Sequence, residues 1–329
     1  MRLLDPRRAL IAARKAQAAL LYRPTGIFGR HAPFYPLNLL DWARSPSLED
    51  AVEGAVVLVT GASSGIGRAT AVKLGEAGAT VLVVARNEDR LREVAAEIEQ
   101  GGGVAHVHPC DLSDLGAIER LAAVVLERHD HVDFLVNNAG RSIRRSVELS
   151  YDRFHDFERT MQLNYFGAVR LIMALLPAMR ERGSGQIINV TTTGVQARVP
   201  RFAAYTASKT ALDGFTDVVA AEAAGDGIRF TKIEMPLVRT PMIEPSQGAH
   251  SAMPSISAEQ AAEWVAKAIV YRPRRIGTPV SDIAGVLNVF APALIELLRS
   301  VGYRVASDSR AARAGAAQSV TRRRTSERA

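Results

Sequence analysis

Short apolar runs alternate with amphipathic helical patterns along most of this 329-residue chain. The apolar runs, interpreted as strands, cover residues 55–60, 80–85, 104–109, 132–137, 186–191, 228–234 and 275–278. The helical patterns between them cover residues 65–77, 88–100, 114–128, 153–182, 203–224 and 258–271. Apolar strands separated by helices are typical of a parallel sheet covered on both faces. The alternation therefore predicts an α/β, doubly wound fold of about seven strands, with ligands at the carboxyl ends of the strands.

A glycine-rich segment, Thr60-Gly-Ala-Ser-Ser-Gly-Ile-Gly67, joins the first apolar run to the first helical pattern. This strand–turn–helix context is what a dinucleotide fingerprint requires, because the helix N-terminus receives the pyrophosphate. The segment predicts a Rossmann-type nucleotide site with these contacts: Gly61, Ser63, Ser64, Gly65, Ile66 and Gly67.

The second informative motif is Tyr205-Thr-Ala-Ser-Lys209, which falls within a helical pattern. Residues four apart lie on the same face of a helix, so the phenol and the ammonium are close enough to interact. A nearby cation favours the phenolate, and we therefore expect a lowered pKa at Tyr205 and a hydroxyl that relays a proton. The two motifs in this order indicate a hydride-transfer enzyme.

The net charge of +7 is concentrated at the two ends of the chain. Residues 1–50 carry eight basic and four acidic residues, and residues 304–329 carry seven basic and two acidic residues. The stretch between them has a net charge of −2, so no nucleic-acid-binding core is expected. For these ends, a solvated, partly disordered chain and contact with anionic lipid remain equal alternatives.

The pattern predicts three parts: a basic N-terminal extension over residues 1–50, partly helical or disordered, a single domain over 51–303, and a basic disordered tail over 304–329. Within the domain we expect a substrate lid near 236–256 and an apolar helix near 283–298. That helix is too short to span a bilayer and is interrupted by Pro292 and Glu296. A lid, an interfacial helix and simple core packing are its alternatives.

The N-terminus lacks the uninterrupted apolar core of a secretory signal, although an Arg-rich, acid-poor leader can mimic a transit peptide. We expect a cytoplasmic protein, with peripheral membrane contact as an open alternative. The single cysteine, Cys110, excludes a disulfide framework and a thiolate metal cluster. The histidines at 106, 108, 129 and 131 have no further ligands at metal spacing, so no metal site is predicted.

Residues 54 to about 240 resemble the short-chain dehydrogenase/reductase family. The resemblance rests on the glycine-rich turn, Asn137-Asn-Ala-Gly140 after the fourth strand, Asn164 in the long helix, and Tyr205 with Lys209. It implies that Tyr205 donates or accepts the proton, that Lys209 binds the nicotinamide ribose, and that Asn164 holds a relay water. It also implies further cofactor contacts at Asp111, Asn138, Ala139, Gly140, Pro236, Val238 and Thr240.

Two positions depart from the family pattern. The serine usual thirteen positions before the tyrosine is Thr192 here, which keeps the hydroxyl that polarises a carbonyl but adds a methyl group. The usual Pro-Gly after the sixth strand is Pro236-Leu237, so a bulky side chain is expected beside the nicotinamide amide.

Cofactor choice depends on the end of the second strand. An acidic residue about 20 positions past the glycines would bind the ribose 2′-hydroxyl and select NAD. This chain has Arg86 there, and a guanidinium pairs well with a 2′-phosphate, so NADP(H) is predicted.

A narrower resemblance, over roughly residues 54–305, is to bacterial fatty acyl-CoA reductases of this fold. It is carried by the segments around residues 131–145, 153–171, 235–243 and 272–276. It implies NADPH-dependent reduction of long-chain acyl-CoA to fatty aldehyde, in a homo-oligomer acting on a lipid substrate. The Arg141, Arg144 and Arg145 cluster is expected to meet CoA phosphates or to be a solvated loop. The alternatives are an oxidoreductase for lipid ketones or alcohols, such as 3-oxoacyl or steroid-like groups, and a cofactor-binding sensor without turnover.

Overall fold

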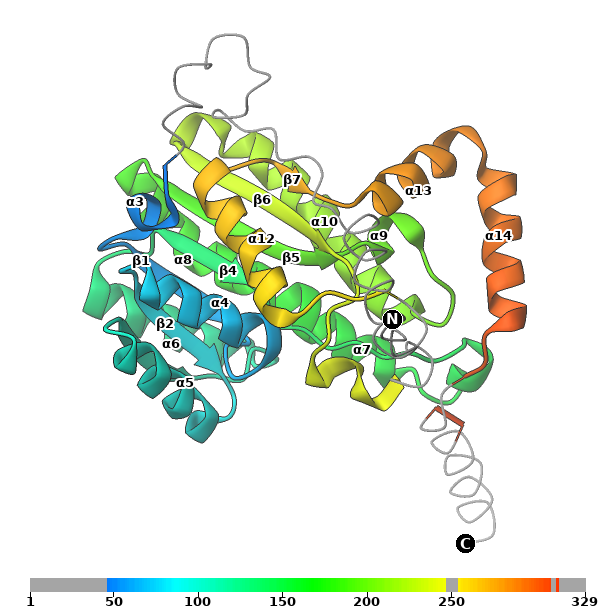
Figure 1. Ribbon diagram of the computed structural model, residues 1–329, viewed down its shortest axis with the longest axis horizontal. Coiled ribbons are helices and arrows are strands. Elements are labelled where there is room, and N and C mark those ends of the chain that lie inside the picture. The colour runs from blue at the N-terminus through cyan, green and yellow to red at the C-terminus, as the bar shows by residue number, and fades with distance from the viewer. Residues whose placement is uncertain (1–45, 247–253, 309–311, 314–329) are drawn as a thin grey trace, which may run out of the picture.

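The computed structural model describes residues 46–246, 254–308 and 312–313. In this part of the chain seven parallel strands form one sheet in the order β3-β2-β1-β4-β5-β6-β7 (Figure 1). The strands are β1 (Val56–Thr60), β2 (Thr80–Ala85), β3 (Val104–Pro109), β4 (Phe134–Asn137), β5 (Gly185–Thr192), β6 (Ile228–Met235) and β7 (Arg275–Ile276). The order reverses between β1 and β4, which is where a doubly wound sheet opens a crevice for its ligand. The predicted fold class is confirmed.

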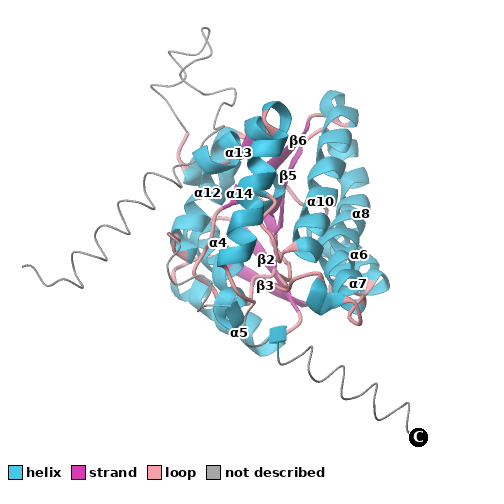
Figure 2. Cartoon of the chain, turned by 90° about the vertical axis from the view of Figure 1, so that its right-hand side faces the viewer, coloured by secondary structure: helices cyan, strands magenta, loops and turns pink. Residues whose placement is uncertain are grey.

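Helices cover both faces of this sheet, as Figure 2 shows in a view turned by 90°. One face carries α4 (Gly65–Glu76), α5 (Glu88–Gln100) and α12 (Ala258–Tyr271), and the other carries α6 (Leu115–His129), α8 (Ala168–Arg182) and α10 (Ala203–Glu222). Shorter elements are α3 (Leu48–Val52), η1 (Glu148–Ser150), α9 (Gly194–Ala197), η3 (Ala224–Asp226) and η4 (Pro241–Ser246).

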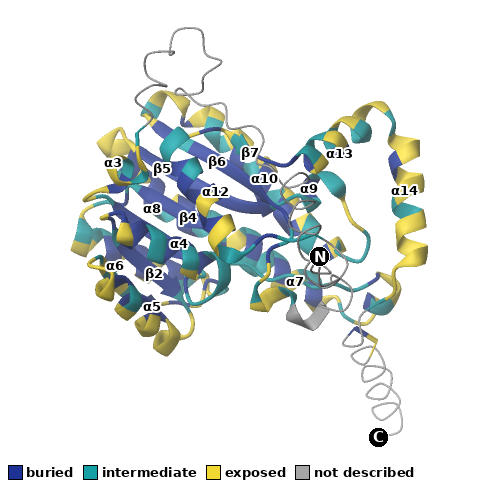
Figure 3. Ribbon diagram, in the orientation of Figure 1, coloured by how far each residue is buried: buried dark blue, intermediate teal, exposed yellow. Residues whose placement is uncertain are grey.

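The strands supply two hydrophobic cores because successive side chains point to opposite faces. Val57 and Val59 pack under α4, α5 and α12, whereas Leu58 packs under α6 and α8. Figure 3 shows the sheet as a continuous buried band between more exposed helices. Strands that are apolar at consecutive positions are therefore a direct consequence of this three-layer arrangement.

The long helix expected over residues 153–182 is divided in three. It consists of α7 (His155–Met161), a π-helical turn η2 (Gln162–Gly167) and α8. A Cβ at Gly167 would collide with the carbonyl oxygen of Leu112, so only glycine lets the loop after β3 approach this turn. Asn164 lies within this π turn, and such turns are frequent at functional sites.

The apolar stretch expected near 283–298 forms two helices, α13 (Pro279–Phe290) and α14 (Pro292–Val305). The separation falls at Ala291, because Pro292 lacks an amide hydrogen to continue the first helix. Helix α14 extends past the tail boundary expected at 304, and Asp308 is bonded to the domain. Two predicted segments cannot be compared with the structure. Residues 1–45 of the predicted N-terminal extension lie outside the described residues, as do residues 247–253 of the predicted lid. None of the described helices is both long and apolar enough to cross a membrane.

Candidate active site

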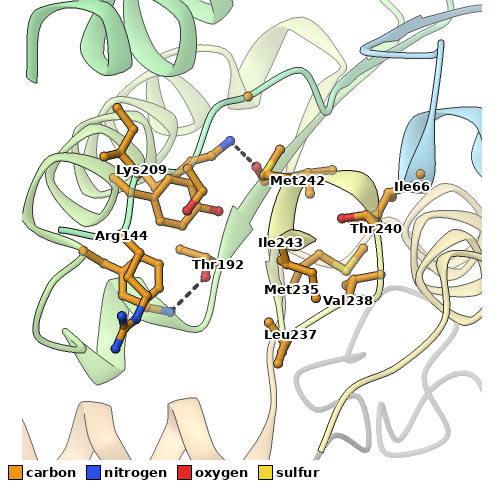
Figure 4. Close-up of a pocket in the computed structure, with 18 of the residues that line it drawn as sticks. Ile66, Arg144, Thr192, Lys209, Met235, Leu237, Val238, Thr240, Met242 and Ile243 are labelled. Atoms are coloured by element: carbon orange, nitrogen blue, oxygen red, sulfur yellow. Dashed lines mark hydrogen bonds between the residues drawn. The ribbon is translucent and has the colours of Figure 1, made fainter. Parts of the chain in front are cut away.

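A cavity of about 1470 Å³ opens at the carboxyl ends of the strands. It extends from the β1–α4 turn, past the ends of β2, β4, β5 and β6, to α14. Figure 4 shows the part of its lining around Thr192, Lys209 and Met242. Most of the predicted site residues line it: Gly61, Ser63, Ser64, Gly65, Ile66, Arg86, Asp111, Asn138, Ala139, Gly140, Thr192, Tyr205, Lys209, Pro236, Val238 and Thr240. Gly67 and Asn164 lie behind this lining and support it.

The glycine-rich turn forms a cradle at the N-terminus of α4. Gly61 and Gly65 have φ values of +66° and +54°, which favour glycine because a Cβ is strained there. A Cβ at Gly67 would collide with the carbonyl oxygen of Gly61, so the third glycine allows the helix to start close against the turn. The side chain of Ser64, the N-cap residue, makes no capping bond, so first-turn amides of α4 remain available to an anion. This geometry fits a dinucleotide pyrophosphate.

One residue that the motif analysis did not assign joins the two halves of this cradle. The Thr60 hydroxyl accepts hydrogen bonds from the backbone amides of Asn138 at 2.9 Å and Ala139 at 3.0 Å. It donates to the Val136 carbonyl at 3.1 Å. The Asn138 side-chain amide adds a bond to the Thr60 carbonyl at 3.0 Å. A threonine at the end of an apolar strand, beside a glycine-rich turn, is the signal that could have identified it.

The hydroxyls of Thr192 and Tyr205 meet at the centre of the cavity. Thr192 ends β5, and its Oγ1 accepts a bond from the Gly194 amide at 3.1 Å. Tyr205 stands in the first turn of α10, and its hydroxyl is bonded to the Thr192 side chain. The Lys209 side chain, one turn later, is 3% exposed, and its Nζ donates to the Val190 carbonyl at 2.8 Å.

The expected lowering of the Tyr205 pKa is not found. Burial raises the pKa of Tyr205 to about 12, and the Thr192 hydroxyl offsets only part of that rise. Burial also lowers the pKa of Lys209 to about 8, so the cation is itself disfavoured in this pocket. The prediction relied on a nearby cation that favours the phenolate, whereas the Lys209 ammonium is buried and directed at the Val190 carbonyl.

Asn164 is fully buried in the π turn. Its Oδ1 accepts from the Arg141 amide at 2.8 Å, and its Nδ2 donates to the Arg141 carbonyl and to Ser208 Oγ, each at 2.9 Å. The side chain thus fixes the loop after β4 and connects it to α10. Its proposed role toward a relay water stays a prediction.

Arg86 is exposed at the end of β2 and lines the outer end of the cavity. Asp111 lies across from it in the loop after β3 and accepts a bond from the Ser113 amide at 2.9 Å. Cys110 also lines this end, and burial raises the pKa of its thiol to about 11. A thiol of that pKa is a poor nucleophile at neutral pH.

The opposite end of the cavity is lined by apolar side chains together with arginines such as Arg144. Leu237, Met242 and Ile243 follow β6, and Leu298 faces the cavity from α14. Leu237 occupies the position after Pro236 where the family pattern has glycine. The Thr192 and Tyr205 hydroxyls therefore lie between a polar nucleotide-sized region and an apolar region.

The arginine cluster after β4 holds the C-terminal segment in place. Arg144 donates to the Ser307 carbonyl at 2.8 Å, and Arg145 donates to the Ala312 carbonyl at 2.9 Å. Arg201 forms an ion pair with Asp308 at 3.2 Å. The expectation of a solvated loop is therefore wrong for Arg144 and Arg145. Arg144 also lines the cavity, and its buried Nη1 has no hydrogen-bond partner among the described residues.

Known proteins resemble this chain in both sequence and structure. The short chain dehydrogenase family model matches residues 55–250. An uncharacterized oxidoreductase of Mycobacterium tuberculosis is 51% identical, with 89% of this chain and 86% of the relative covered. A protein of Acinetobacter baylyi named fatty acyl-CoA reductase is 52% identical, with 79% and 88% covered. The crystal structure of actinorhodin polyketide ketoreductase with NADPH is 32% identical and has a TM-score of 0.63, with 70% of this chain and 96% of that chain covered.

Proposed function

The chain belongs to the short-chain dehydrogenase family of oxidoreductases, and from that premise we propose that it reduces long-chain fatty acyl-CoA to fatty aldehyde and CoA with NADPH. The main structural support is the position of the Thr192 and Tyr205 hydroxyls, which lie between the nucleotide cradle and an apolar region of one cavity. The likeness to the Acinetobacter baylyi reductase supports the choice of substrate.

We assign NADP(H) to the polar end of the cavity. The glycine cradle and the first turn of α4 would hold the pyrophosphate, and Arg86 would pair with the 2′-phosphate. Lys209 would bond the nicotinamide ribose, after exchanging its contact with the Val190 carbonyl. The NADPH named for the related ketoreductase structure supports this assignment.

When bound, the cofactor supplies a hydride to the carbonyl carbon. Thr192 and Tyr205 would donate hydrogen bonds to the carbonyl oxygen and stabilise its developing negative charge. Tyr205 would then transfer its proton to that oxygen, which gives a hemithioacetal. Collapse of the hemithioacetal breaks the carbon–sulfur bond and releases aldehyde and CoA thiol. No protein nucleophile is required, which agrees with the position of Cys110 at the adenine end.

Arg144 would meet an anionic group of the CoA moiety. Its guanidinium lies at the cavity wall and keeps a buried, unpartnered Nη1 among the described residues. A buried donor without a partner costs free energy, and an anion from the substrate would remove that cost. The apolar side chains of Leu237, Met242 and Leu298 would contact the acyl chain.

The deciding experiment measures NADPH oxidation and free thiol together, across acyl-CoAs of increasing chain length. We expect thiol and oxidised cofactor in equal amounts, with kcat/KM rising steeply toward long chains, because each buried CH₂ contributes about 0.8 kcal/mol at most. NADPH oxidation with ketones, and no thiol from any acyl-CoA, would replace this proposal with the lipid ketone reductase.

That second candidate has its own support. Any carbonyl could accept hydrogen bonds from Thr192 and Tyr205, and the related solved structure is named a polyketide ketoreductase. The two functions differ in the leaving group, so only thiol release separates them. A sensor without turnover would oxidise no NADPH in either assay.

A further inference from the structure

Helix α13 presents an apolar face that the described residues leave uncovered. Ile283, Val286, Val289 and Phe290 are all exposed, and Val289 and Phe290 reach 72% and 82%. The opposite side of the helix is fixed against the domain: Ser281 and Ala284 are buried, and Asn288 donates to the Gln196 carbonyl at 2.7 Å. The apolar residues therefore point outward because the polar ones are bonded inward.

Helix α14 repeats this arrangement. Its exposed residues Leu294, Leu297, Val301 and Val305 are spaced by three and four positions, which places them on one face. On the inward side Ile295 is buried, and Arg299 donates to the Ala197 carbonyl at 2.9 Å. The outer apolar face is defined here as the exposed apolar residues that point away from the cavity: Ile283, Val286, Val289, Phe290, Leu294, Leu297, Val301 and Val305. Figure 3 shows α14 as largely exposed and α13 as partly exposed.

The charges beside this face favour an anionic partner. Over α13 and α14 the acidic residues are Asp282, which is paired with Arg275 at 2.6 Å, and Glu296. The basic segment of residues 304–329, with seven basic and two acidic residues, begins in the last turn of α14. An apolar helical face combined with a polybasic segment is the pair of signals that holds a protein on an anionic membrane surface.

We propose that the outer apolar face lies on an anionic lipid surface, with α13 and α14 in the plane of the headgroups, and that the positive charge of residues 304–329 strengthens the attraction to this surface. The helices lie on such a surface rather than cross it, since no described helix is long and apolar enough to span a membrane. Helix α14 also forms part of the cavity wall through Leu298 and Gly302, and Ala306 directly after it continues this wall. If the proposed function holds, this position would deliver an acyl substrate from the lipid; the surface contact itself does not depend on it.

Vesicle flotation of the full-length protein tests this surface without any substrate. The probes are phosphatidylcholine vesicles and vesicles that also contain phosphatidylglycerol. The apolar variant is Phe290→Ser with Leu297→Ser, one exposed residue from each helix. The matched control is Val104→Ser with Val218→Ser, which removes exposed valines from β3 and α10. The charge variant is Arg322→Ser, Arg323→Ser and Arg324→Ser.

We expect wild type and the control to float with the anionic vesicles, and the apolar variant to bind at least about tenfold more weakly. The charge variant should lose most of the preference for phosphatidylglycerol, because each basic residue near the surface adds to the attraction. Retained NADPH binding, measured by fluorescence, shows that each variant is folded.

Results of two kinds would overturn the proposal. One comes from the flotation assay: wild-type protein that does not float, or an apolar variant that floats as well as wild type, contradicts binding through the outer apolar face. The other comes from light scattering: if the apolar variant breaks a wild-type oligomer into monomers and leaves flotation unchanged, the outer apolar face binds a second copy of the chain. Loss of thioester reduction with intact flotation would instead count only against the proposed function.

Discussion

The buried ammonium of Lys209 should destabilise the folded protein, although we propose that the site needs this side chain. Replacing Lys209 with methionine should therefore raise stability and abolish turnover. Its ammonium is buried and has one hydrogen bond, to the Val190 carbonyl. Burial lowers the pKa of Lys209 from an ordinary 10.5 to about 8. At 1.36 kcal/mol per pKa unit, this shift reduces the free energy of unfolding by about 3 kcal/mol below pH 8. Losing the bond to Val190 costs about 1–2 kcal/mol. We therefore expect Lys209→Met to raise the free energy of unfolding by about 1–2 kcal/mol at pH 7.

The stability difference between wild type and Lys209→Met should change with pH in a defined direction. Below pH 8 the folded wild type buries a cation. Between pH 8 and 10.5 Lys209 is neutral in the folded state, whereas the unfolded chain still binds the proton. The free energy of unfolding of wild type therefore rises with pH in this range. The advantage of Lys209→Met should therefore disappear at about pH 9 and reverse by about pH 10.5, where wild type should be about 1–2 kcal/mol more stable. Urea unfolding at pH 7, 9 and 10.5 measures it, and turnover should be lost at every pH.

Lys232→Met is the matched control. That lysine is also buried, but its Nζ pairs with Asp213 at 3.0 Å and Asp217 at 2.7 Å. Its loss leaves a buried carboxyl without its cation, so stability should fall by about 2 kcal/mol or more. A Lys209→Met protein that is less stable than wild type at pH 7, or whose stability difference is independent of pH, would refute the burial argument.

Three further outcomes follow from the site. Tyr205→Phe should reduce turnover about 10²- to 10⁴-fold with little change in NADPH affinity, and retention of more than about a tenth of the activity would exclude the phenol as proton donor. Arg86→Ala should weaken NADPH binding about 10- to 150-fold and NADH binding much less, as calorimetry with both cofactors can measure. Arg144→Gln should raise KM for acyl-CoA and leave NADPH affinity unchanged; equal KM values would show that Arg144 only holds the C-terminal segment.

The fold could be predicted from sequence because each element has a periodic signal of its own. Consecutive apolar residues such as Val57, Leu58 and Val59 identify a strand buried on both faces, and glycines at strand ends mark the turns. The π turn at Gln162–Gly167 could not be predicted, since it depends on the Leu112 backbone approaching Gly167 from another part of the chain.

Many residues of the candidate site could be predicted from the sequence, but their pKa shifts and hydrogen-bond partners could not. Most of the residues that the motifs identified line the cavity, because short spacing in the chain fixes them on one turn or one helix face. Burial and hydrogen-bond direction are tertiary properties, and they reverse the expected pKa shift at Tyr205. The partners of Arg144 and Arg145 lie more than 160 positions away, at Ser307 and Ala312, so no local pattern could reveal them.

The cavity is built from two separately encoded halves. The glycine-rich cradle and the hydroxyls of Thr192 and Tyr205 fall within residues 55–250, the stretch that matches the family model, whereas Leu298, Gly302 and Ala306 of the cavity wall lie beyond it. Mutations in the last helix can therefore change which molecules fit without moving Thr192, Tyr205 or Lys209. The size and polarity of the cavity could therefore be altered from a part of the chain outside the family match.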